Sequence, residues 1–159
     1  MSDEAKAFRR ALGSFATGVT IITTVAEDGT KMGLTVSSFN SVSLNPPLVL
    51  WSLDRRARSL TTFQTAKYFA VHVLSSDQES LSNRFATQSP DKFLDIPVTP
   101  GLGDIPLLSG CAALFQCETK HQYEGGDHII FVGEVKSFEH HDRAPLVFHG
   151  GRYAALAKS

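Results

Sequence analysis

The stretch Gly33–Ser59, GLTVSSFNSVSLNPPLVLWSLDRRARS, is the part of the sequence around which the rest of the chain is organised. It opens with small and hydroxyl residues typical of a polar-lined strand and reaches a corner at Pro46 and Pro47. These prolines cannot continue a β ladder, because proline has no backbone N–H to donate. The apolar run Leu48–Leu53 then predicts a short strand buried on both faces, and an arginine-rich turn follows it.

The strand at the start of this stretch could lie against a flat ligand. Thr35, Ser37 and Ser38 carry short hydroxyl groups close to Gly33, and such small residues leave room for a ring. The alternative is ordinary strand chemistry, since threonine favours strands and alternate hydroxyl groups can face water. The residues alone leave both interpretations open.

The turn after the second strand could bind a phosphate through Arg55, Arg56 or Arg58. Ser59 is placed to cap a helix through Ala66, and the free amides at a helix start, joined by one arginine, can bind an anion. The alternative is a turn that lies in solvent. Arg58 and Ser59 are the favoured phosphate ligands, and the other two arginines are expected in solvent.

The sequence before this stretch predicts a helix and a β-hairpin. Three apolar residues recur there at helical spacing: Phe8, Leu12 and Phe15. We therefore expect an amphipathic helix over residues 4–14. Residues 19–25 are rich in β-branched side chains and predict a strand, and residues 27–30 contain the Asp-Gly pair of a tight hairpin. The partner strand is expected to run over residues 31–44.

Short strands and one further helix are predicted after residue 66. Residues 69–74 form an apolar strand pattern. Ser76-Asp77-Gln78-Glu79 matches a capping box, so a helix is expected to run to about Ala86. The four prolines between residues 89 and 106 predict a long irregular loop that flanks the site.

A long hairpin is predicted near the C-terminal end. Residues 111–122 and 129–139 have strand patterns and face each other across a Gly-Gly turn at residues 124–127. Residues 145–148 predict one more short strand. Six or seven strands linked mainly by hairpins favour a closed antiparallel barrel over a doubly wound sheet. The glycine-rich turn of a parallel nucleotide-binding unit is absent from the sequence.

Length and composition predict one globular domain over residues 1–159, with 42% hydrophobic and 19% charged residues. A net charge of −1 gives no overall field for nucleic acid or a membrane surface, so any recognition of anions must be local. The start of the chain has acidic residues, and no run of about eighteen apolar residues occurs, so a cytoplasmic location is expected. In that reducing environment, Cys111 and Cys117 are expected to be buried thiols.

The six histidines do not predict a metal site. His140 and His141 are adjacent, so on a strand they would point to opposite faces and could not share one ion. His72 lies within an apolar strand and is expected in the core with its polar atoms paired. His128 follows the tight turn of the long hairpin, where its side chain is either solvated or directed at a ligand.

Three ordered motifs carry a resemblance to a known family. They are residues 15–20 (FATGVT), residues 33–48 (GLTVSSFNSVSLNPPL) and residues 126–135 (GDHIIFVGEV). Together they resemble the flavin reductase-like family of split β-barrels, and the resemblance covers about residues 8–156. That family includes the small reductase components of two-component flavin monooxygenases. The resemblance implies a mainly β, antiparallel Greek-key split β-barrel with a few peripheral helices.

The resemblance also implies an activity, cofactors and partners. It implies a homodimer that binds FMN or FAD, oxidises NADH or NADPH, and supplies reduced flavin by diffusion to a separate oxygenase. The residues implied in flavin binding are Thr35, Val36, Ser37, Ser38, Ser52, Leu53, Arg58, Ser59, Arg152 and Tyr153. Arg84 and Lys92 are further candidates for the same phosphate, or for the adenylate end if the flavin is FAD. His128 is implied at the nicotinamide side as the catalytic candidate, where it could orient the carboxamide or return a proton. A flavin- or haem-binding barrel without catalysis is the alternative function.

Overall fold

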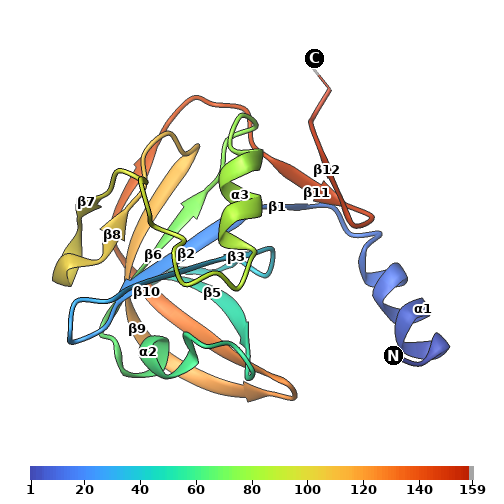
Figure 1. The fold of residues 1–159 in the computed structure, drawn as a ribbon, viewed down its shortest axis with the longest axis horizontal. Helices are drawn as coiled ribbons and strands as arrows, with labels where there is room; N and C mark the ends of the chain where they lie inside the picture. The colour runs from blue at the N-terminus through green and yellow to red at the C-terminus, as the bar shows by residue number, and fades with distance from the viewer. Residues whose placement is uncertain (158–159) are drawn as a thin grey trace.

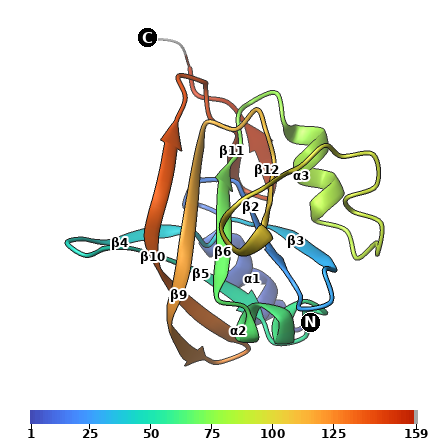
Figure 2. The same cartoon turned by 90° about the vertical axis from the view of Figure 1, so that its left-hand side faces the viewer.

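One antiparallel sheet of seven strands forms the centre of the protein, as shown by a computed structural model that describes residues 1–157. The strands of this sheet are β2 (Thr20–Val25), β3 (Lys31–Val36), β4 (Asn40–Leu44), β5 (Pro47–Asp54), β6 (Tyr68–Val73), β9 (Ala113–Gly125) and β10 (His128–His140). Their order across the sheet is β3-β2-β6-β9-β10-β5-β4 (Figures 1 and 2). Neighbouring strands pair antiparallel throughout, which confirms the predicted mainly β, antiparallel fold class.

The remaining elements surround this sheet. The helices are α1 (Asp3–Leu12), α2 (Leu60–Thr65), α3 (Glu79–Phe85) and the 3₁₀ turn η1 (Leu102–Asp104). Short strands form two smaller sheets: β1 (Thr17–Gly18) with β11 (Val147–His149) and β12 (Arg152–Ala154), and β7 (Thr99–Pro100) with β8 (Pro106–Leu107). Among residues 1–157, no helix has both the length and the apolar character needed to cross a membrane.

The prediction of a closed barrel is wrong, because the sheet stays open between β3 and β4. The single strand predicted over residues 31–44 is also wrong, since residues 37–39 separate these two strands. The chain leaves its pairing with β2 at this point and begins to pair with β5. Ser38 fixes the crossing, because its Oγ accepts from the Ser52 amide at 2.9 Å and donates to the Ser52 carbonyl at 3.2 Å.

A cluster of aromatic side chains fills the interior on one face of β5. Trp51 stacks on Phe131 of β10 with ring centroids 4.9 Å apart and meets Phe63 of α2 edge-on at the same distance. All three rings are buried. Burial alternates along β5, with Val49, Trp51 and Leu53 inside, so the prediction of a strand buried on both faces is wrong. The opposite face of β5 is free to help form a surface groove.

Neither predicted helix cap is present. Ser59 has helical backbone angles and makes no side-chain bond to the start of α2, so its predicted cap is wrong. The capping box predicted at residues 76–79 is also wrong, because Gln78 precedes α3 and makes no cap bond. The Gln78 side chain instead accepts from the Ser75 amide at 3.0 Å and donates to the Ser109 carbonyl at 3.0 Å. Contacts with another loop thus replace the local cap.

Several other predicted elements are confirmed with shifted ends. The β2–β3 hairpin, the strand β6 and the long β9–β10 hairpin are all present. Cys111 precedes β9 and Cys117 lies on it, and burial raises the pKa of the two thiols to about 11 and about 12. Both are free and buried, as predicted. The segment over residues 89–106 contains β7 and η1, so it is less irregular than predicted.

Helix α1 stands apart from the main sheet, close to the β11–β12 hairpin (Figure 1). It is the amphipathic helix that the sequence predicts, but none of its residues is buried. Phe8 is 65% exposed, Leu12 is 59% exposed, and Phe15 just after the helix is 79% exposed. The apolar side of α1 is therefore uncovered in the single chain.

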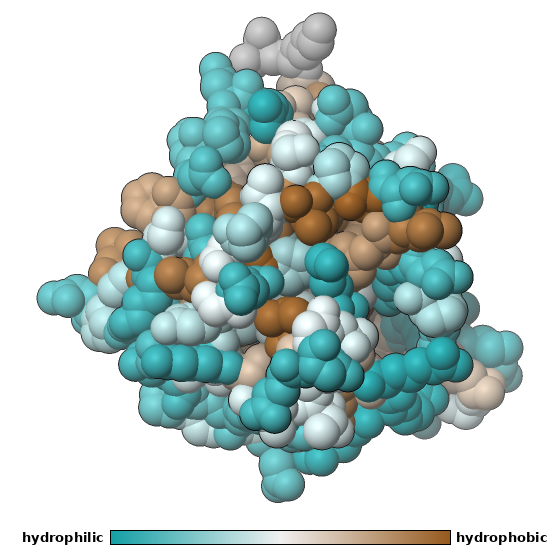
Figure 3. All heavy atoms as spheres, turned by 60° about the vertical axis from the view of Figure 1, so that its left-hand side comes forward, coloured by the Kyte–Doolittle hydropathy of each residue, from teal (hydrophilic) through white to brown (hydrophobic). Residues whose placement is uncertain are grey.

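On the face of the molecule shown in Figure 3, the hydrophobic areas are interrupted by hydrophilic residues.

His72 is a fully paired core residue, as predicted. It lies on β6 with no exposed surface, and its Nδ1 is 2.9 Å from the Ile21 carbonyl oxygen. The Leu108 amide donates to its Nε2 at 3.0 Å, so Nδ1 carries the proton and the ring is neutral. Burial lowers the pKa of His72 to about 4, because a charged ring would lose its hydration there.

This burial predicts a pH-dependent stability. The unfolded chain takes up a proton near pH 6.5, whereas folded His72 does so only near pH 4, so stability is highest above pH 6.5 and falls as the pH drops toward 4. We expect His72 to remove about 2 kcal/mol from the free energy of unfolding between pH 7 and pH 5. Urea denaturation at both pH values and one protein concentration measures this loss.

His72→Gln should weaken this pH dependence by about the same 2 kcal/mol, even though the variant is less stable at pH 7. The matched control is His140→Gln at an exposed site, which should keep the wild-type pH dependence. An unchanged pH dependence in His72→Gln would show that another group is responsible.

Candidate functional site

A groove of about 910 Å³ lies along the open side of the sheet. It is lined by residues 30–38, most of residues 52–59, most of residues 85–93, and His128. These segments are β3 with its continuation, the end of β5 with the arginine turn, the end of α3 with the following loop, and the start of β10. A cavity of this size with several polar groups is typical of a small-molecule site.

The hydroxyl groups predicted to face a ligand are partly engaged within the protein. Thr35 Oγ1 donates to the Ser82 carbonyl of α3 at 2.6 Å. Ser38 holds Ser52 through the two bonds described above. Ser37 lies between them and is exposed. Thr35 and Ser38 therefore shape the groove wall, and Ser37 presents its side chain to solvent.

Aromatic side chains form the wall between β3 and the loop after α3. Phe85 and Phe93 meet edge-on with centroids 5.0 Å apart. A Cβ added to Gly33 would lie 2.9 Å from the Phe85 ring, closer than atoms of a real side chain can approach. Gly33 therefore lets the aromatic pair pack directly on the β3 backbone. This packing gives the groove an apolar portion beside its polar groups.

The arginine turn places one paired and one largely free guanidinium group at the groove. Arg56 donates to both carboxylate oxygens of Asp54, at 3.2 and 3.0 Å. These bonds hold the pKa of Asp54 down at about 2. Arg58 makes only a long contact of 3.5 Å to the Gln88 carbonyl and is exposed. Arg58 is therefore the least engaged of the three arginines in this turn.

Lys92 brings a second cation into the groove wall. Its Nζ donates to the Gly33 carbonyl at 3.0 Å and to the Phe85 carbonyl at 3.1 Å. Partial burial lowers the pKa of Lys92, because the charged form loses hydration. Lys31, Arg56 and Arg58 add further positive charge to the groove lining, which holds a single carboxylate, Asp54. The groove is thus locally positive in a chain whose net charge is −1.

His128 stands at the other side of the groove, as the first residue of β10. Its Nδ1 is 2.7 Å from Asp127 Oδ1. The residue opposite it in the neighbouring strand is Asp54. The side chain is partly exposed and lines the groove, so it can contact a bound molecule.

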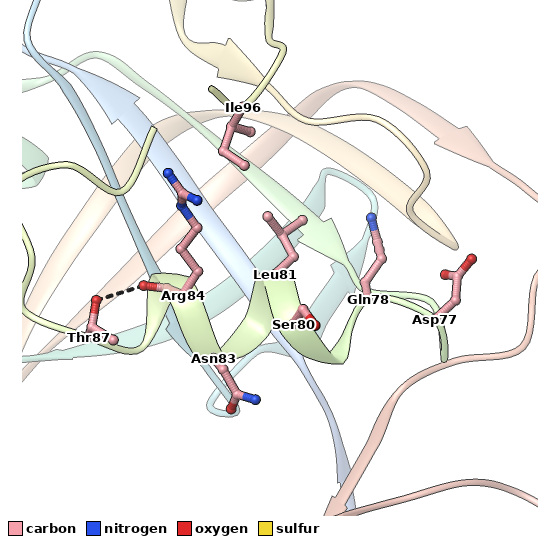
Figure 4. A pocket seen from close by; sticks show the side chains of 8 residues that line it. All are labelled: Asp77, Gln78, Ser80, Leu81, Asn83, Arg84, Thr87 and Ile96. Atoms are coloured by element: carbon pink, nitrogen blue, oxygen red, sulfur yellow. Dashed lines mark hydrogen bonds between the residues drawn. The ribbon is translucent and has the colours of Figure 1, made fainter. Parts of the chain in front are cut away.

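Three of the predicted flavin-binding residues lie outside this groove. Arg84 points from α3 toward the loop that contains Ile96 and lines a separate shallow hollow (Figure 4). Its guanidinium group donates to the Lys92, Asp91 and Leu94 carbonyls, which holds that loop against the helix.

The other two lie on β12, at the far side of α3. Tyr153 Oη bonds to Ser82 Oγ at 2.6 Å and donates to Asn83 Oδ1 at 3.0 Å. Arg152 is exposed. Within this chain, neither residue reaches the groove.

The groove also contains residues that the sequence interpretation missed. Thr30, Lys31 and Met32 line it, as does the segment over residues 86–88. Ser89 and Pro90 also line it, and they belong to the loop that was predicted to flank the site. Lys31 lies on the same strand as Thr35, so its place in the groove lining could have been predicted from the sequence. Nothing in the sequence marked residues 86–88, because their position depends on the packing of α3. Among residues 1–157, no cluster of histidine, cysteine or carboxylate side chains could hold a metal ion.

Comparison with known proteins supports one family. A family model described as flavin reductase like domain matches residues 12–157. The FMN reductase (NADH) SmoA of Agrobacterium fabrum is 42% identical over 98% of this chain and 88% of its own length. The reductase component of a flavin-dependent trigonelline monooxygenase from Acinetobacter baylyi is 40% identical over 95% of this chain, which spans about half (49%) of that relative.

A solved structure gives the same result. The NADH:FAD oxidoreductase SgcE6 of Streptomyces globisporus, in complex with NAD and FAD fragments, matches with a TM-score of 0.91 and 38% identity. The match covers 98% of this chain and 93% of that one. The predicted resemblance is therefore confirmed, and the chain belongs to the flavin reductase like domain family.

Proposed function

We propose that this protein is an NAD(P)H-dependent flavin reductase that reduces FMN or FAD by hydride transfer. The observation that carries the proposal is the groove itself, which combines an apolar aromatic wall, hydrogen-bonding groups and cations in one cavity of about 910 Å³. Flavin and nicotinamide nucleotides combine flat rings with phosphates, so these lining groups suit them. Relatives named FMN reductase (NADH) and NADH:FAD oxidoreductase support the same activity.

The lining residues suggest how the groove is divided. The backbone over residues 35–38, with Ser52 and Leu53, would hold the flavin ring, because Ser38 keeps the two segments together. Arg58 would bind phosphate through a charge-assisted hydrogen bond, with Ser59 beside it and Lys92 as a second cation. When bound, the two nucleotides supply the hydride transfer themselves, and the protein supplies orientation and charge.

His128 is the proposed catalytic residue at the nicotinamide side. It lines the groove, and Asp127 orients its ring through Nδ1. The remaining nitrogen, Nε2, could orient the carboxamide or hold a proton. Both roles need the imidazole at the groove, and the position of His128 in the groove lining supports this proposal.

We further propose a homodimer that passes reduced flavin to a separate oxygenase. The uncovered apolar side of α1, with Phe8 and Leu12, is a surface that a second copy would bury. Val42 and Leu44 on the edge strand β4 are also exposed, at 49% and 95%. The oxygenase partner is supported by the relative named as a monooxygenase reductase component. The cytoplasmic location stays a prediction.

The central experiment is an assay of nicotinamide oxidation with purified protein. NADH and NADPH are each tested with riboflavin, FMN and FAD, and the nicotinamide absorbance is followed. We expect flavin-dependent loss of absorbance for at least one pair. Tight flavin binding without oxidation of either nicotinamide would instead indicate a binding protein without catalysis.

His128→Ala should lower kcat/KM for the reduced nicotinamide by about tenfold or more, because a group that orients or protonates the substrate is lost. Flavin affinity, measured by fluorescence quenching, should change by less than about twofold. His140→Ala is the matched control, since His140 is exposed at the far end of β10. Unchanged kinetics in His128→Ala would remove this residue from the site.

Arg58→Gln should raise the Kd of FMN or FAD by about tenfold, since a charge-assisted hydrogen bond to phosphate is lost. Arg56→Gln in the same turn is the comparison, because Arg56 is already bound to Asp54 and should have a smaller effect. Riboflavin, which lacks phosphate, should bind both variants alike. An equal loss for riboflavin would show that Arg58 does not act on the phosphate.

Sedimentation should show the wild-type protein as a dimer. Phe8→Ser combined with Leu12→Ser should shift it toward monomer at micromolar concentration, because the apolar contact is lost. Lys6→Ser on the opposite side of α1 is the control and should stay dimeric. A monomeric wild-type protein would contradict the proposed dimer.

A further inference from the structure

Two turns meet at the end of the groove where β5 and β10 lie side by side. One is the arginine turn that follows β5, and the other joins β9 to β10 and leads into His128. The strand pairing ends at His128 opposite Asp54. The turn residues Gly126 and Asp127 lie beyond that last pair, where no further ladder holds them to β5.

Arg55 bridges this gap with both its backbone and its side chain. Its amide donates to the Asp127 carbonyl at 2.9 Å, and its Nε donates to the Gly126 carbonyl at 2.8 Å. Its guanidinium group also lies 3.5 Å from Glu124 Oε1. Arg55 thus contacts three residues of this turn, Glu124, Gly126 and Asp127. From the sequence alone, the Arg55 side chain is expected in solvent.

The Nε bond is the side-chain contact that matters in this arrangement. The Glu124 side chain is 88% exposed, and an ion pair so exposed contributes little. By contrast, the Nε bond pairs a backbone carbonyl at a turn where Gly126 has a φ of 68°, a conformation that favours glycine. A charged donor to such a carbonyl is stronger than a neutral one.

Arg55 does not itself line the groove, whereas its neighbours Asp54 and Arg56 do. It can therefore act on a bound molecule only through the residues that it holds. On the other side of the bridge, Asp127 contacts His128 Nδ1 at 2.7 Å. The path from Arg55 to the imidazole thus runs through the backbone of residues 126 and 127.

We propose that Arg55 is a positioning residue for the nicotinamide side of the site. It fixes the turn before His128 to the turn that carries Arg58, so the group that meets the nicotinamide keeps a set distance from the group that meets the flavin phosphate. This inference rests on the proposed reductase function for its kinetic consequence. Its structural consequence, an ordered turn over residues 124–128, does not depend on that function.

Two substitutions separate the hydrogen bond from the charge. Arg55→Met removes the Nε donor and the charge together. Arg55→Gln removes the charge but places an amide nitrogen the same number of bonds from Cα as the arginine Nε, so it can still donate to Gly126. Glu124→Gln is the matched control, because it removes only the ion pair. The backbone bond from residue 55 to Asp127 is unaffected in all three.

The first readout is amide hydrogen exchange of the purified protein without cofactors. We expect about five- to tenfold faster exchange over residues 124–128 in Arg55→Met, with the core strands unchanged. Arg55→Gln and Glu124→Gln should stay within about twofold of wild type. If exchange in Arg55→Met equals that of wild type, or if Arg55→Gln is as fast as Arg55→Met, the inference is overturned.

The second readout is kinetic. Arg55→Met should raise KM for the reduced nicotinamide by about five- to tenfold, while the Kd of the flavin changes by less than about twofold. An equal loss of flavin affinity would overturn a role specific to the nicotinamide side. If wild-type protein shows no nicotinamide oxidation, the reductase proposal fails, and the exchange measurement alone decides whether Arg55 orders the turn.

Discussion

The groove depends on a serine hydroxyl that holds its two sides together where the sheet itself stays open. The seven-stranded sheet begins at one edge with β3 and ends at the other with β4, and these two edge strands do not pair with each other. Ser38 lies in the short segment between them, and its Oγ bonds to both the amide and the carbonyl of Ser52. These bonds hold the segment that follows β3 against Ser52 of β5, at a point where β3 has already ended. Groups from β3, β5 and β10 can therefore line a single cavity.

The pattern of strands could be predicted because hairpins are local. The Asp-Gly turn at residues 28–29 and the Gly-Gly turn at residues 125–126 each join strands that pair directly with one another. The break between β3 and β4 could not be predicted, since residues 37–39 have the same strand-like composition as their neighbours. It is decided by a long-range contact with β5. The capping box before α3 failed for the same reason, because Gln78 bonds to Ser109 in a loop distant in sequence.

The groove lining could be predicted where its residues lie within one of the sequence motifs. It could not be predicted where tertiary packing brings other segments to the groove. Thr35, Ser52, Arg58 and His128 all line it, on segments that the motifs had marked. Arg84 lies outside this lining, since its side chain points from α3 toward the loop that contains Ile96 (Figure 4). The Arg84 guanidinium group donates to backbone carbonyls of the loop that carries Lys92. Arg84 therefore supports the groove lining from behind. A single sequence shows no sign of which face of such a short helix will be outward.

The burial of both thiols has a practical consequence for work on this protein. With the pKa of Cys111 near 11 and that of Cys117 near 12, only about one thiol in ten thousand or fewer is ionised at pH 7. Thiol reagents attack the thiolate, and both sulfur atoms lie behind packed side chains. A cysteine introduced on the surface would thus be labelled selectively in the folded protein. A fluorophore or spin label could then be attached at one chosen site without first replacing the native cysteines.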